Sequence, residues 1–404
     1  MAPVTAMKLT QLRALVAIAE GHTVNAAARR LYRTQPAVSA ALAELERELG
    51  QPLFERGQRG MSPTPPGRLL AARAAQGLDG LAVAARAGGL PPATAARVRQ
   101  QASDAQLEAL GALVETGGFT AAARQLGVAQ ASVHRAVTSL ARRLGAKLWN
   151  SSGRLVEPTA AAGGIALGYA RYRSELRLAQ DELREAQGRL DGQLLIGALP
   201  TARASWLPRS LVRTLRAYPE AGVLVVDGPY EEQLVALRHG RLDLILGALR
   251  EPMPAADIEQ ENVFEDTLSI VVRAGHPLAP GFDSARDRLT SPQLQKLRWL
   301  LPPVGTPARR CFQAFMRGRE LTEPPQSVEC NSFLTIRAML LETDYAAIVP
   351  TSQVASDAVR SGLKIMGPPL RGSQHPAGWT VRAGFRPTQL QRAFLAIARE
   401  EAAR

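Results

Sequence analysis

The chain has 404 residues, a formal net charge of +13 and two cysteines. It is long enough for about two to four domains, and it lacks both the run of roughly 20 apolar residues that spans a bilayer and a cysteine framework for disulfides or zinc. The positive charge is concentrated, since residues 1–190 hold 24 basic and 14 acidic side chains, whereas residues 191–404 hold 25 and 22. A basic N-terminal part favours a polyanionic partner.

The stretch from Thr23 to Leu49 has the periodicity of two short helices that meet at a tight turn, and an amphipathic helix over residues 9–16 precedes them. Thr34 is predicted to cap the second helix of the pair, and Pro36 is tolerated in its first turn because early N–H groups lack intrahelical partners. The outer face near the start of this helix carries small or amide side chains, which suit insertion into a DNA major groove. These side chains are Gln35, Ser39 and Ala40. The alternative for this stretch is an ordinary hairpin of two helices.

Residues 51–67 continue with an apolar anchor and a glycine-containing turn that two arginines flank. This pattern is typical of a β-wing beside a helix-turn-helix, with Arg56 and Arg59 placed for phosphates or the minor groove.

The residues up to this point resemble the winged helix-turn-helix of LysR-type transcriptional regulators. The resemblance is carried by Gln11-Leu12, Ala27-Ala28, Leu31, Gln35-Pro36-Ala37-Val38-Ser39, Leu45-Glu46, Leu49-Gly50, Leu53-Phe54, Arg56 and Pro63-Thr64. It implies that Gln35, Pro36 and Ser39 lie on the helix that reads DNA, with Arg56 and Arg59 at the wing. One departure is Gly21-His22-Thr23-Val24, where the family usually has Gly-Ser-Phe.

A shift of 95 positions reproduces this pattern, which indicates a tandem duplication. Gln35 corresponds to Gln130, and Arg59 corresponds to Arg154. The second copy loses part of the predicted reading surface, because Thr34, Pro36, Ser39 and Arg56 become Ala129, Ala131, His134 and Ser151. Because Arg135 is basic, the second copy can still contact the DNA backbone. We therefore expect the first copy to read bases and the second to bind DNA without specificity or to serve assembly.

Two linkers follow the two copies. Residues 68–103 contain glycines that weaken any short helix there, whereas residues 161–190 show an a/d seam of nearly four heptads. In the resembling family the helix after the DNA-binding domain forms the dimer interface, so we expect dimerisation through this seam. Its residues are Ile165, Tyr169, Tyr172, Leu176 and Leu183. The alternative is a helix that docks on its own domain.

From residue 191 the pattern changes to strands that alternate with helices, which predicts parallel βαβ units. We expect two α/β lobes, about residues 191–250 with 350–404 and about 251–349, joined by crossing strands near residues 246–249 and 348–350. This half resembles the LysR-type effector-binding domain, similar to periplasmic binding proteins, in the subgroup of the galactose-binding-protein and protocatechuate regulators. Members of that subgroup respond to sugars or aromatic acids.

Several residues at predicted strand ends are candidates for binding the effector, because ligands of open α/β sheets bind there. Thr201 and Thr306 each follow a strand and precede a helix, where free N–H groups favour a carboxylate, and Arg203 can pair with that anion. The alternative is that both threonines are helix caps. The other candidates are Gly228, Tyr230, Leu249, Asn331 and Ser332.

The predicted fold class is therefore multidomain: winged helix-turn-helix domains at residues 8–67 and 104–160, linkers at 68–103 and 161–190, and an effector-binding domain at 191–404. No acid/base pair, nucleophile or metal-ligand spacing is present in the sequence, so we expect neither an enzyme nor a cofactor. Cys311 and Cys330 are either redox sensors or buried structural thiols.

The expected function is transcription regulation through sequence-specific DNA binding, modulated by a small organic anion, in a cytoplasmic homodimer or homotetramer without a signal peptide. The expected partners are double-stranded DNA and the effector, with RNA polymerase as a further candidate and no membrane. The alternative is an architectural DNA-binding protein that needs no effector.

Overall fold

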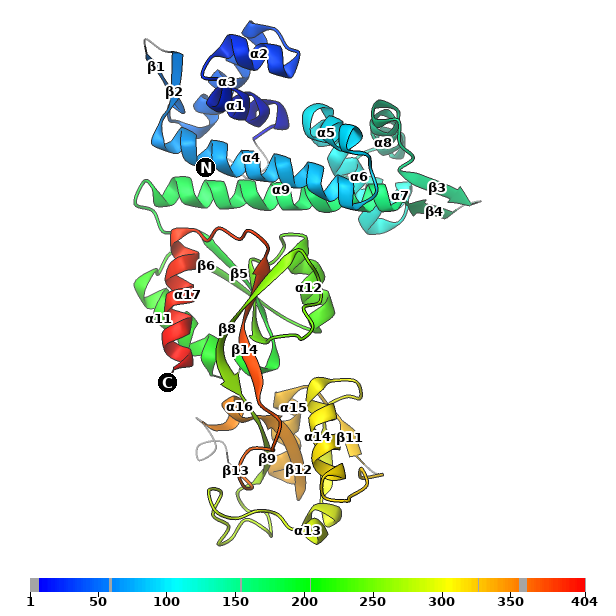
Figure 1. Ribbon diagram of the computed structural model, residues 1–404, viewed down its shortest axis with the longest axis vertical. Coiled ribbons are helices and arrows are strands. Elements are labelled where there is room, and N and C mark those ends of the chain that lie inside the picture. The colour runs from blue at the N-terminus through cyan, green and yellow to red at the C-terminus, as the bar shows by residue number, and fades with distance from the viewer. Residues whose placement is uncertain are drawn as a thin grey trace. The chain divides into compact units, whose positions relative to one another are not determined.

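The computed structural model describes residues 7–57, 60–152, 155–203, 205–325, 327–355 and 362–403. It forms two compact units, an N-terminal unit up to Gln193 with Arg238–Arg241, and a C-terminal unit of Leu194–Leu237 and Leu242–Arg404 (Figure 1). Within the part of the chain that is described, no helix is both long and apolar enough to cross a membrane.

The N-terminal unit begins with the first winged unit, residues 9–63, which has the predicted helix-turn-helix and wing. Its elements are α1 (Leu9–Gly21), α2 (Val24–Leu31), α3 (Gln35–Leu49), β1 (Phe54–Gly57) and β2 (Gly60–Pro63). Leu12 of α1, Ala27 of α2 and Leu45 of α3 are fully buried and join the three helices in one core.

The predicted cap of α3 is wrong in its chemistry. Thr34 occupies the N-cap position, but its side chain accepts no cap hydrogen bond. Pro36 stands at the second position of the helix and has no N–H, which removes one of the two donors that an N-cap side chain uses. Loss of a threonine at Ala129 therefore costs the second copy no cap.

The second winged unit, residues 104–158, repeats the first, and each of its elements begins 95 positions after its counterpart. The elements are α6 (Asp104–Thr116), α7 (Phe119–Leu126), α8 (Gln130–Leu144), β3 (Trp149–Ser152) and β4 (Leu155–Pro158). The helices that follow the two wings, α4 (Pro65–Ala87) and α9 (Ala160–Glu185), have the same offset, and α5 (Pro92–Gln101) joins α4 to the second winged unit.

The first linker differs from the expectation, because α4 is a continuous helix of 23 residues. Gly77 inside α4 and Gly88 directly after its end are sites of close packing, whereas a Cβ atom at Gly80 would meet nothing within 4 Å. A Cβ atom at Gly77 would lie 3.0 Å from Cδ2 of Tyr172, and one at Gly88 would lie 3.1 Å from Cα of Gly164. Packing against α9 thus outweighs the low helix propensity of glycine.

The predicted dimer seam on α9 is already buried within one chain. Ile165, Tyr169, Tyr172, Leu176 and Leu183 are all buried, and α9 packs along α4. Within the single chain these five side chains pack as the alternative of a helix docked on its own domain predicts, and their contact with a second chain stays a prediction. An apolar seam reports that a helix has a partner but does not say which one.

The C-terminal unit contains two five-stranded sheets, each with helices on both faces, as a two-lobed α/β domain requires. The first sheet has the order β6-β5-β7-β14-β8, with the strands Gly222–Asp227, Gln193–Ala198, Leu244–Ala248, His375–Arg382 and Ile258–Asp266. The second has the order β11-β10-β12-β9-β13, with the strands Ser327–Glu329, Arg298–Leu301, Tyr345–Pro350, Leu268–Arg273 and Leu363–Ile365.

Eight helices are described in this unit. Those of the first lobe are α10 (Pro200–Arg203), α11 (Trp206–Ala217), α12 (Tyr230–Arg238) and α17 (Gln389–Ala402). Those of the second lobe are α13 (Ser291–Lys296), α14 (Pro307–Arg317), α15 (Phe333–Glu342) and α16 (Thr351–Ala355).

The predicted lobe boundaries need correction. Strand β8 belongs to the first sheet and β13 to the second, so the chain crosses at Thr267 and again between residues 366 and 374. The predicted crossing near residues 246–249 and 348–350 is wrong, since β7 and β12 each end inside their own lobe. Alternating apolar residues mark a strand but do not reveal which sheet it joins.

Candidate DNA-binding and effector-binding sites

The start of α3 presents the predicted reading surface of the first winged unit. Gln35, Pro36 and Ala40 are exposed and Ser39 is partly exposed, whereas Val38 and Leu42 on the opposite face are buried. Thr34, just before the helix, is exposed as well. This separation leaves the N-terminal end of α3 free to enter a groove.

The wing of the first unit is fixed to α3 by one carboxylate. Oε1 of Glu46 accepts hydrogen bonds from the backbone N–H groups of Leu53, at 2.7 Å, and Phe54, at 3.2 Å. Arg56 is exposed on β1, where phosphates are within reach of a wing. Arg59, the second predicted wing arginine, lies outside the described residues.

The second winged unit organises the same positions differently. Gln130 and Arg135 are exposed at the start of α8, and Nη2 of Arg135 donates to Oγ of Ser132 at 3.3 Å. His134, the counterpart of Ser39, packs edge-on against Phe119 and Trp149, with ring centroids 5.0 and 6.0 Å away. The His134 ring is exposed and also contacts the wing through Trp149. Arg154 lies outside the described residues.

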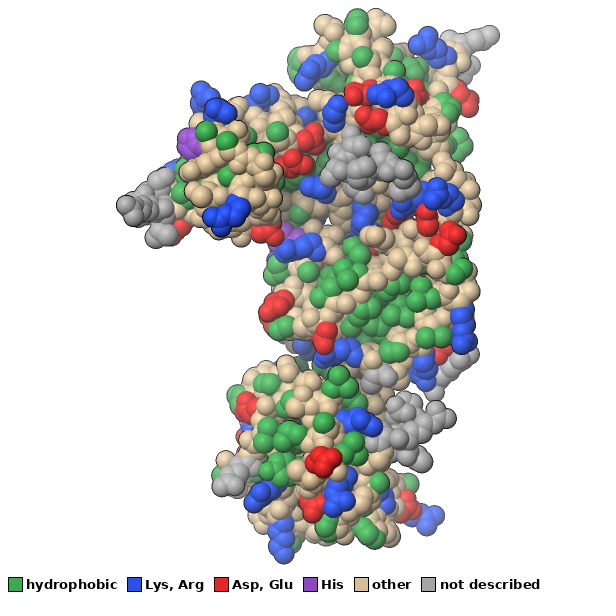
Figure 2. Space-filling model, turned by 180° about the vertical axis from the view of Figure 1, so that it is seen from behind, with side chains coloured by type: hydrophobic (Ala, Val, Ile, Leu, Met, Phe, Trp, Pro, Cys, Tyr) green, Lys and Arg blue, Asp and Glu red, His purple; other side chains and the backbone are tan. Residues whose placement is uncertain are grey.

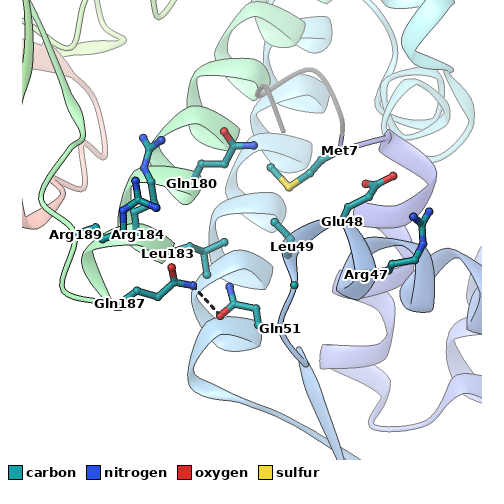
Figure 3. A pocket seen from close by; sticks show the side chains of 11 residues that line it. Met7, Arg47, Glu48, Leu49, Gln51, Gln180, Leu183, Arg184, Gln187 and Arg189 are labelled. Carbon is teal, nitrogen blue, oxygen red and sulfur yellow. Dashed lines mark hydrogen bonds between the residues drawn. The ribbon is translucent and has the colours of Figure 1, made fainter. Parts of the chain in front are cut away.

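A cavity of about 280 Å³ opens where α3 ends beside the end of α9 (Figure 3). Arg47 and Leu49 of α3 and Leu183 and Gln187 of the α9 region line it, and Nε2 of Gln187 donates to Oε1 of Gln51 at 3.4 Å. The C-terminal end of the reading helix thus touches the segment that leads into the C-terminal unit.

The predicted effector-binding residues stand where the parallel strands of each sheet end. Thr201, Arg203, Gly228, Tyr230 and Leu249 follow β5, β6 and β7. Asn331 and Ser332 follow β11, and Thr306 follows β10. Strand pairing is parallel between β5 and β7 and between β10 and both β11 and β12, so these groups share an edge in each sheet.

Three of these side chains already have partners. Thr306 caps α14, because its Oγ1 accepts from the N–H of Arg309 at 3.2 Å and donates to the carbonyl of Pro303 at 2.8 Å. Ser332 caps α15 in the same way. Arg203 forms an ion pair with Asp227. The cap interpretation therefore accounts for Thr306.

Another guanidinium, that of Arg250, stands at the end of β7 and was missed in the sequence. It lies 4.6 Å from the centroid of the Tyr230 ring, which is buried. Among the described residues no carboxylate contacts it, in contrast to Arg203. Its place directly after Leu249 at a strand end is the signal that could have identified it.

A network of buried polar groups at the crossing between the sheets was also missed. The carboxylate of Asp266 accepts from the backbone N–H of Thr267 and from Oγ of Ser352, each within 2.8 Å. Ser352 Oγ also lies 3.4 Å from the carbonyl oxygen of Thr201. The network thus joins α16, which follows β12 in one lobe, to α10, which follows β5 in the other. The polar residues directly after two apolar strands are its sequence signal.

The cysteines are free and half-buried. Burial raises the pKa of the Cys311 thiol above its usual value, which disfavours the thiolate that a redox sensor needs. Among the residues described, no three or more His, Cys, Asp or Glu side chains are grouped to hold a metal.

Residues 187–403 match the family described as the LysR substrate binding domain. The family of bacterial regulatory helix-turn-helix proteins of the lysR type matches twice, at residues 9–68 and 105–163. The chain belongs to the LysR family of transcriptional regulators. It is a DNA-binding regulator with an effector-binding domain.

Two relatives differ in how much of this regulator they match. The transcriptional regulator GalR of Pseudomonas putida is 31% identical over 395 residues, which cover 97% of this chain and 96% of that protein. PcaQ of Agrobacterium fabrum is 29% identical over 269 residues, 66% of this chain and 84% of that protein.

The solved structure of full-length OxyR from Pseudomonas aeruginosa matches with a TM-score of 0.51 and 22% identity. It covers 73% of this chain and 97% of OxyR, so a nearly complete regulator of that fold leaves about a quarter of this chain unmatched.

Proposed function

We propose that the first winged unit reads the operator sequence, with Gln35 and Ser39 on base edges and Pro36, Ala40 and Thr34 against the groove wall. Arg56 and Arg59 then hold the backbone. The observation that carries this proposal is the contrast at one position: Ser39 presents a small hydroxyl on the reading face of α3, whereas its exposed counterpart His134 is a ring that also packs against Phe119 and Trp149. The second winged unit binds phosphates through Arg135 and Arg154, with Gln130 beside them.

The effector of this proposal is a small organic anion, such as an aromatic or sugar acid, held between the strand ends of the two lobes. Arg250, which is partly exposed, and Thr201, which is buried at the strand ends, replace Arg203 as the principal contacts, because Arg203 already pairs with Asp227. Gly228, Tyr230, Leu249, Asn331 and Ser332 line the same edges. The network around Asp266 and Ser352 links the lobes and carries their closure to the rest of the chain.

Calorimetry on the full chain tests this site with benzoate, hydroxybenzoates and sugar acids. Arg250→Ala is expected to weaken binding of the responding acid at least tenfold, and Arg203→Ala less than threefold. Unchanged affinity in Arg250→Ala, or no binding of any of these acids, would contradict the proposed effector site.

The oligomer of this regulator uses the effector unit in this proposal, since the seam on α9 is occupied. Strand β6 is at the edge of its sheet and exposes Leu224 and Val225, and neighbouring α11 exposes Val212 and Leu215. Figure 2 shows hydrophobic side chains gathered on a face of this lobe. A second copy can pair with this edge. Leu224→Lys is expected to lower the mass of the assembly in sedimentation; an unchanged mass would contradict this interface.

The remaining parts of the proposal concern the setting. The regulator acts in the cytoplasm on double-stranded DNA, with RNA polymerase as the partner through which it changes transcription, and it catalyses no reaction. Footprinting the purified protein with and without candidate acids gives the operator. Protection that does not respond to any acid would favour the architectural alternative.

A further inference from the structure

Equivalent residues of the two repeats touch each other in the N-terminal unit. Tyr172 is the counterpart of Gly77, 95 positions later, and a Cβ atom at Gly77 would lie 3.0 Å from its Cδ2 and 3.3 Å from its Cα. Asp104 is the counterpart of Leu9, and its Oδ2 accepts a hydrogen bond of 3.0 Å from the Leu9 N–H. Equivalent residues meet in this way only beside an axis that rotates one copy onto the other.

The rotation is by half a turn, because α4 and α9 run antiparallel. Contacts join Arg73 to Glu175, Gly77 to Tyr172 and Leu81 to Gly168, so numbers rise along one helix as they fall along the other. Each winged unit leads directly into the N-terminal end of its helix, and antiparallel helices place these ends at opposite ends of the pair (Figure 1). The N-terminal unit therefore has the pseudo-twofold symmetry of a dimer, although a single chain forms it.

The length of the helix pair suits DNA. At 1.5 Å per residue the 23 residues of α4 span about 35 Å. One turn of B-DNA separates the two half-sites of a dimeric helix-turn-helix protein by about 34–36 Å.

The residues at the axis fit only when different helices pair. Gly77 provides the space that the Tyr172 ring fills. Two copies of α4 would place Gly77 against itself and leave a void, and two copies of α9 would force two tyrosine rings into one space. The same argument holds at Leu9 and Asp104. If two first copies paired, Leu9 would face Leu9, and no side chain would accept a hydrogen bond from the start of α1. If two second copies paired, Asp104 would face Asp104, and the two carboxylates would repel each other.

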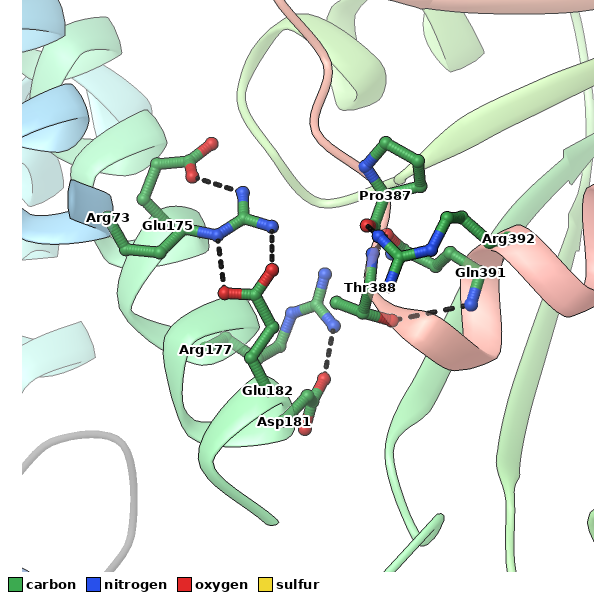
Figure 4. A network of polar contacts seen from close by, with 9 residues as sticks. All are labelled: Arg73, Glu175, Arg177, Asp181, Glu182, Pro387, Thr388, Gln391 and Arg392. Carbon is green, nitrogen blue, oxygen red and sulfur yellow. Dashed lines mark hydrogen bonds and ion pairs between the residues drawn. The ribbon is translucent and has the colours of Figure 1, made fainter. Parts of the chain in front are cut away.

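A buried ion cluster adds to this selectivity. The guanidinium of Arg73 is 1% exposed and contacts Glu175 at 2.8 Å and Glu182 at 2.7 Å (Figure 4). The counterparts of these residues in the other copy are Gly168, Gly80 and Ala87. Pairing α4 with a second α4 would thus leave Arg73 buried opposite glycine and alanine, which is strongly unfavourable for a charge.

We propose that α4 and α9 of one chain pair only with each other, so that a single chain forms a complete two-headed DNA-binding unit. That chain occupies an asymmetric operator with two half-sites about one helical turn apart, one read by α3 and one held loosely by α8. The pairing of α4 with α9 is inferred from the contacts described above. The different roles of α3 and α8 at the two half-sites rest on the proposed function.

Disulfide trapping on the full chain tests the pairing without DNA. The variant carries Gly77→Cys with Tyr172→Cys in a background of Cys311→Ser and Cys330→Ser, and each single cysteine serves as the matched control. At low protein concentration, oxidation is expected to give one cross-linked chain of monomer mass and altered mobility, and no covalent dimer from either control. A covalent dimer from the double variant shows pairing between chains and overturns the proposal, as does one from a single-cysteine control.

Stoichiometry on DNA is the second measurement and uses the unaltered protein, so it does not depend on the folding of a variant. At saturation, a short duplex that holds the footprinted half-sites one turn apart is expected to bind at one duplex per chain in native mass spectrometry, whatever the number of chains that associate through the effector unit. One duplex for every two chains would overturn the proposal. If footprinting finds no specific sequence, the proposed function fails, and the trapping result still decides the pairing.

Discussion

The two winged units have the same elements at a constant offset, yet they keep their wings in place by different means. In the first, Glu46 of α3 accepts hydrogen bonds from the wing backbone. In the second, the counterpart is Ala141, and His134 packs between Phe119 and Trp149 instead. In the first unit, α3 supports the wing through Glu46, which lies outside the reading face. In the second unit, α8 contacts the wing through His134, which lies on the reading face. A duplicated fold can keep its core in both copies while the residues of the reading face change in one of them.

The asymmetry extends to the helices that join the copies. Arg73 on α4 faces two glutamates on α9, and no equivalent cluster forms from Gly168. One copy contributes the space and the cation, and the other contributes the ring and the anions. This division makes each copy depend on the other.

The largest effect is expected from removing the cation of this cluster. Arg73→Ala leaves Glu175 and Glu182 side by side in a largely buried place, and loss of one partner of a buried ion pair typically costs about 3–5 kcal/mol. Urea denaturation followed by circular dichroism should show this loss in the transition of the N-terminal unit. Arg86→Ala, on an exposed part of the same helix, is the control and should change stability by less than about 0.5 kcal/mol. A loss below about 1 kcal/mol in Arg73→Ala would contradict the role of the cluster.

The second prediction compares the reading helices directly. Gln35→Ala should weaken operator binding by about 1–3 kcal/mol, or roughly 5- to 150-fold, because an amide on a base edge is lost. Gln130→Ala, the equivalent change in the other copy, should cost less than about threefold. Fluorescence anisotropy at one salt concentration measures both. Equal losses would show that both helices read bases.

Most of the fold could be predicted from the sequence, and the failures share a cause. The repeat predicted the positions of the three helices and the wing in each copy, because offset and periodicity are local properties. The helix α4 was missed because Gly77 and Gly80 weaken a helix in isolation, and only the packing of Tyr172, far away in sequence, explains why Gly77 is needed. The seam on α9 was recognised, but its packing against α4 of the same chain was not predicted, for the same reason.

The effector site shows the same limit. Strand ends could be located from the sequence, but the ion pair of Arg203 with Asp227 and the stacking of Arg250 on Tyr230 depend on neighbouring loops. Sequence alone does not tell which of two arginines has a carboxylate beside it.

The third prediction concerns the arginines of the second winged unit. Arg135→Ala should weaken binding by the same factor on operator and unrelated DNA, and should reduce the slope of log affinity against log salt by about 1, since one phosphate contact is lost. Arg317→Ala, exposed in the effector unit, is the control and should leave the slope unchanged. A loss confined to the operator would instead assign base reading to this residue.

The smallest effect is expected at the axis itself, where Asp104 titrates and its counterpart Leu9 does not. Burial raises the pKa of Asp104 above 3.8 and outweighs the opposing effects of the Leu9 N–H and of Arg13 and Arg173. A carboxyl whose pKa is higher in the folded state binds more protons there than in the unfolded state, so its contribution to stability falls as the pH rises from 3.8 through the raised value. Asp104→Asn removes this titration but keeps the shape. The stability of the wild type relative to this variant should therefore decline over that pH range and stay constant above it. A relative stability that rises with pH would show that the cap on α1 outweighs the cost of burying the charge.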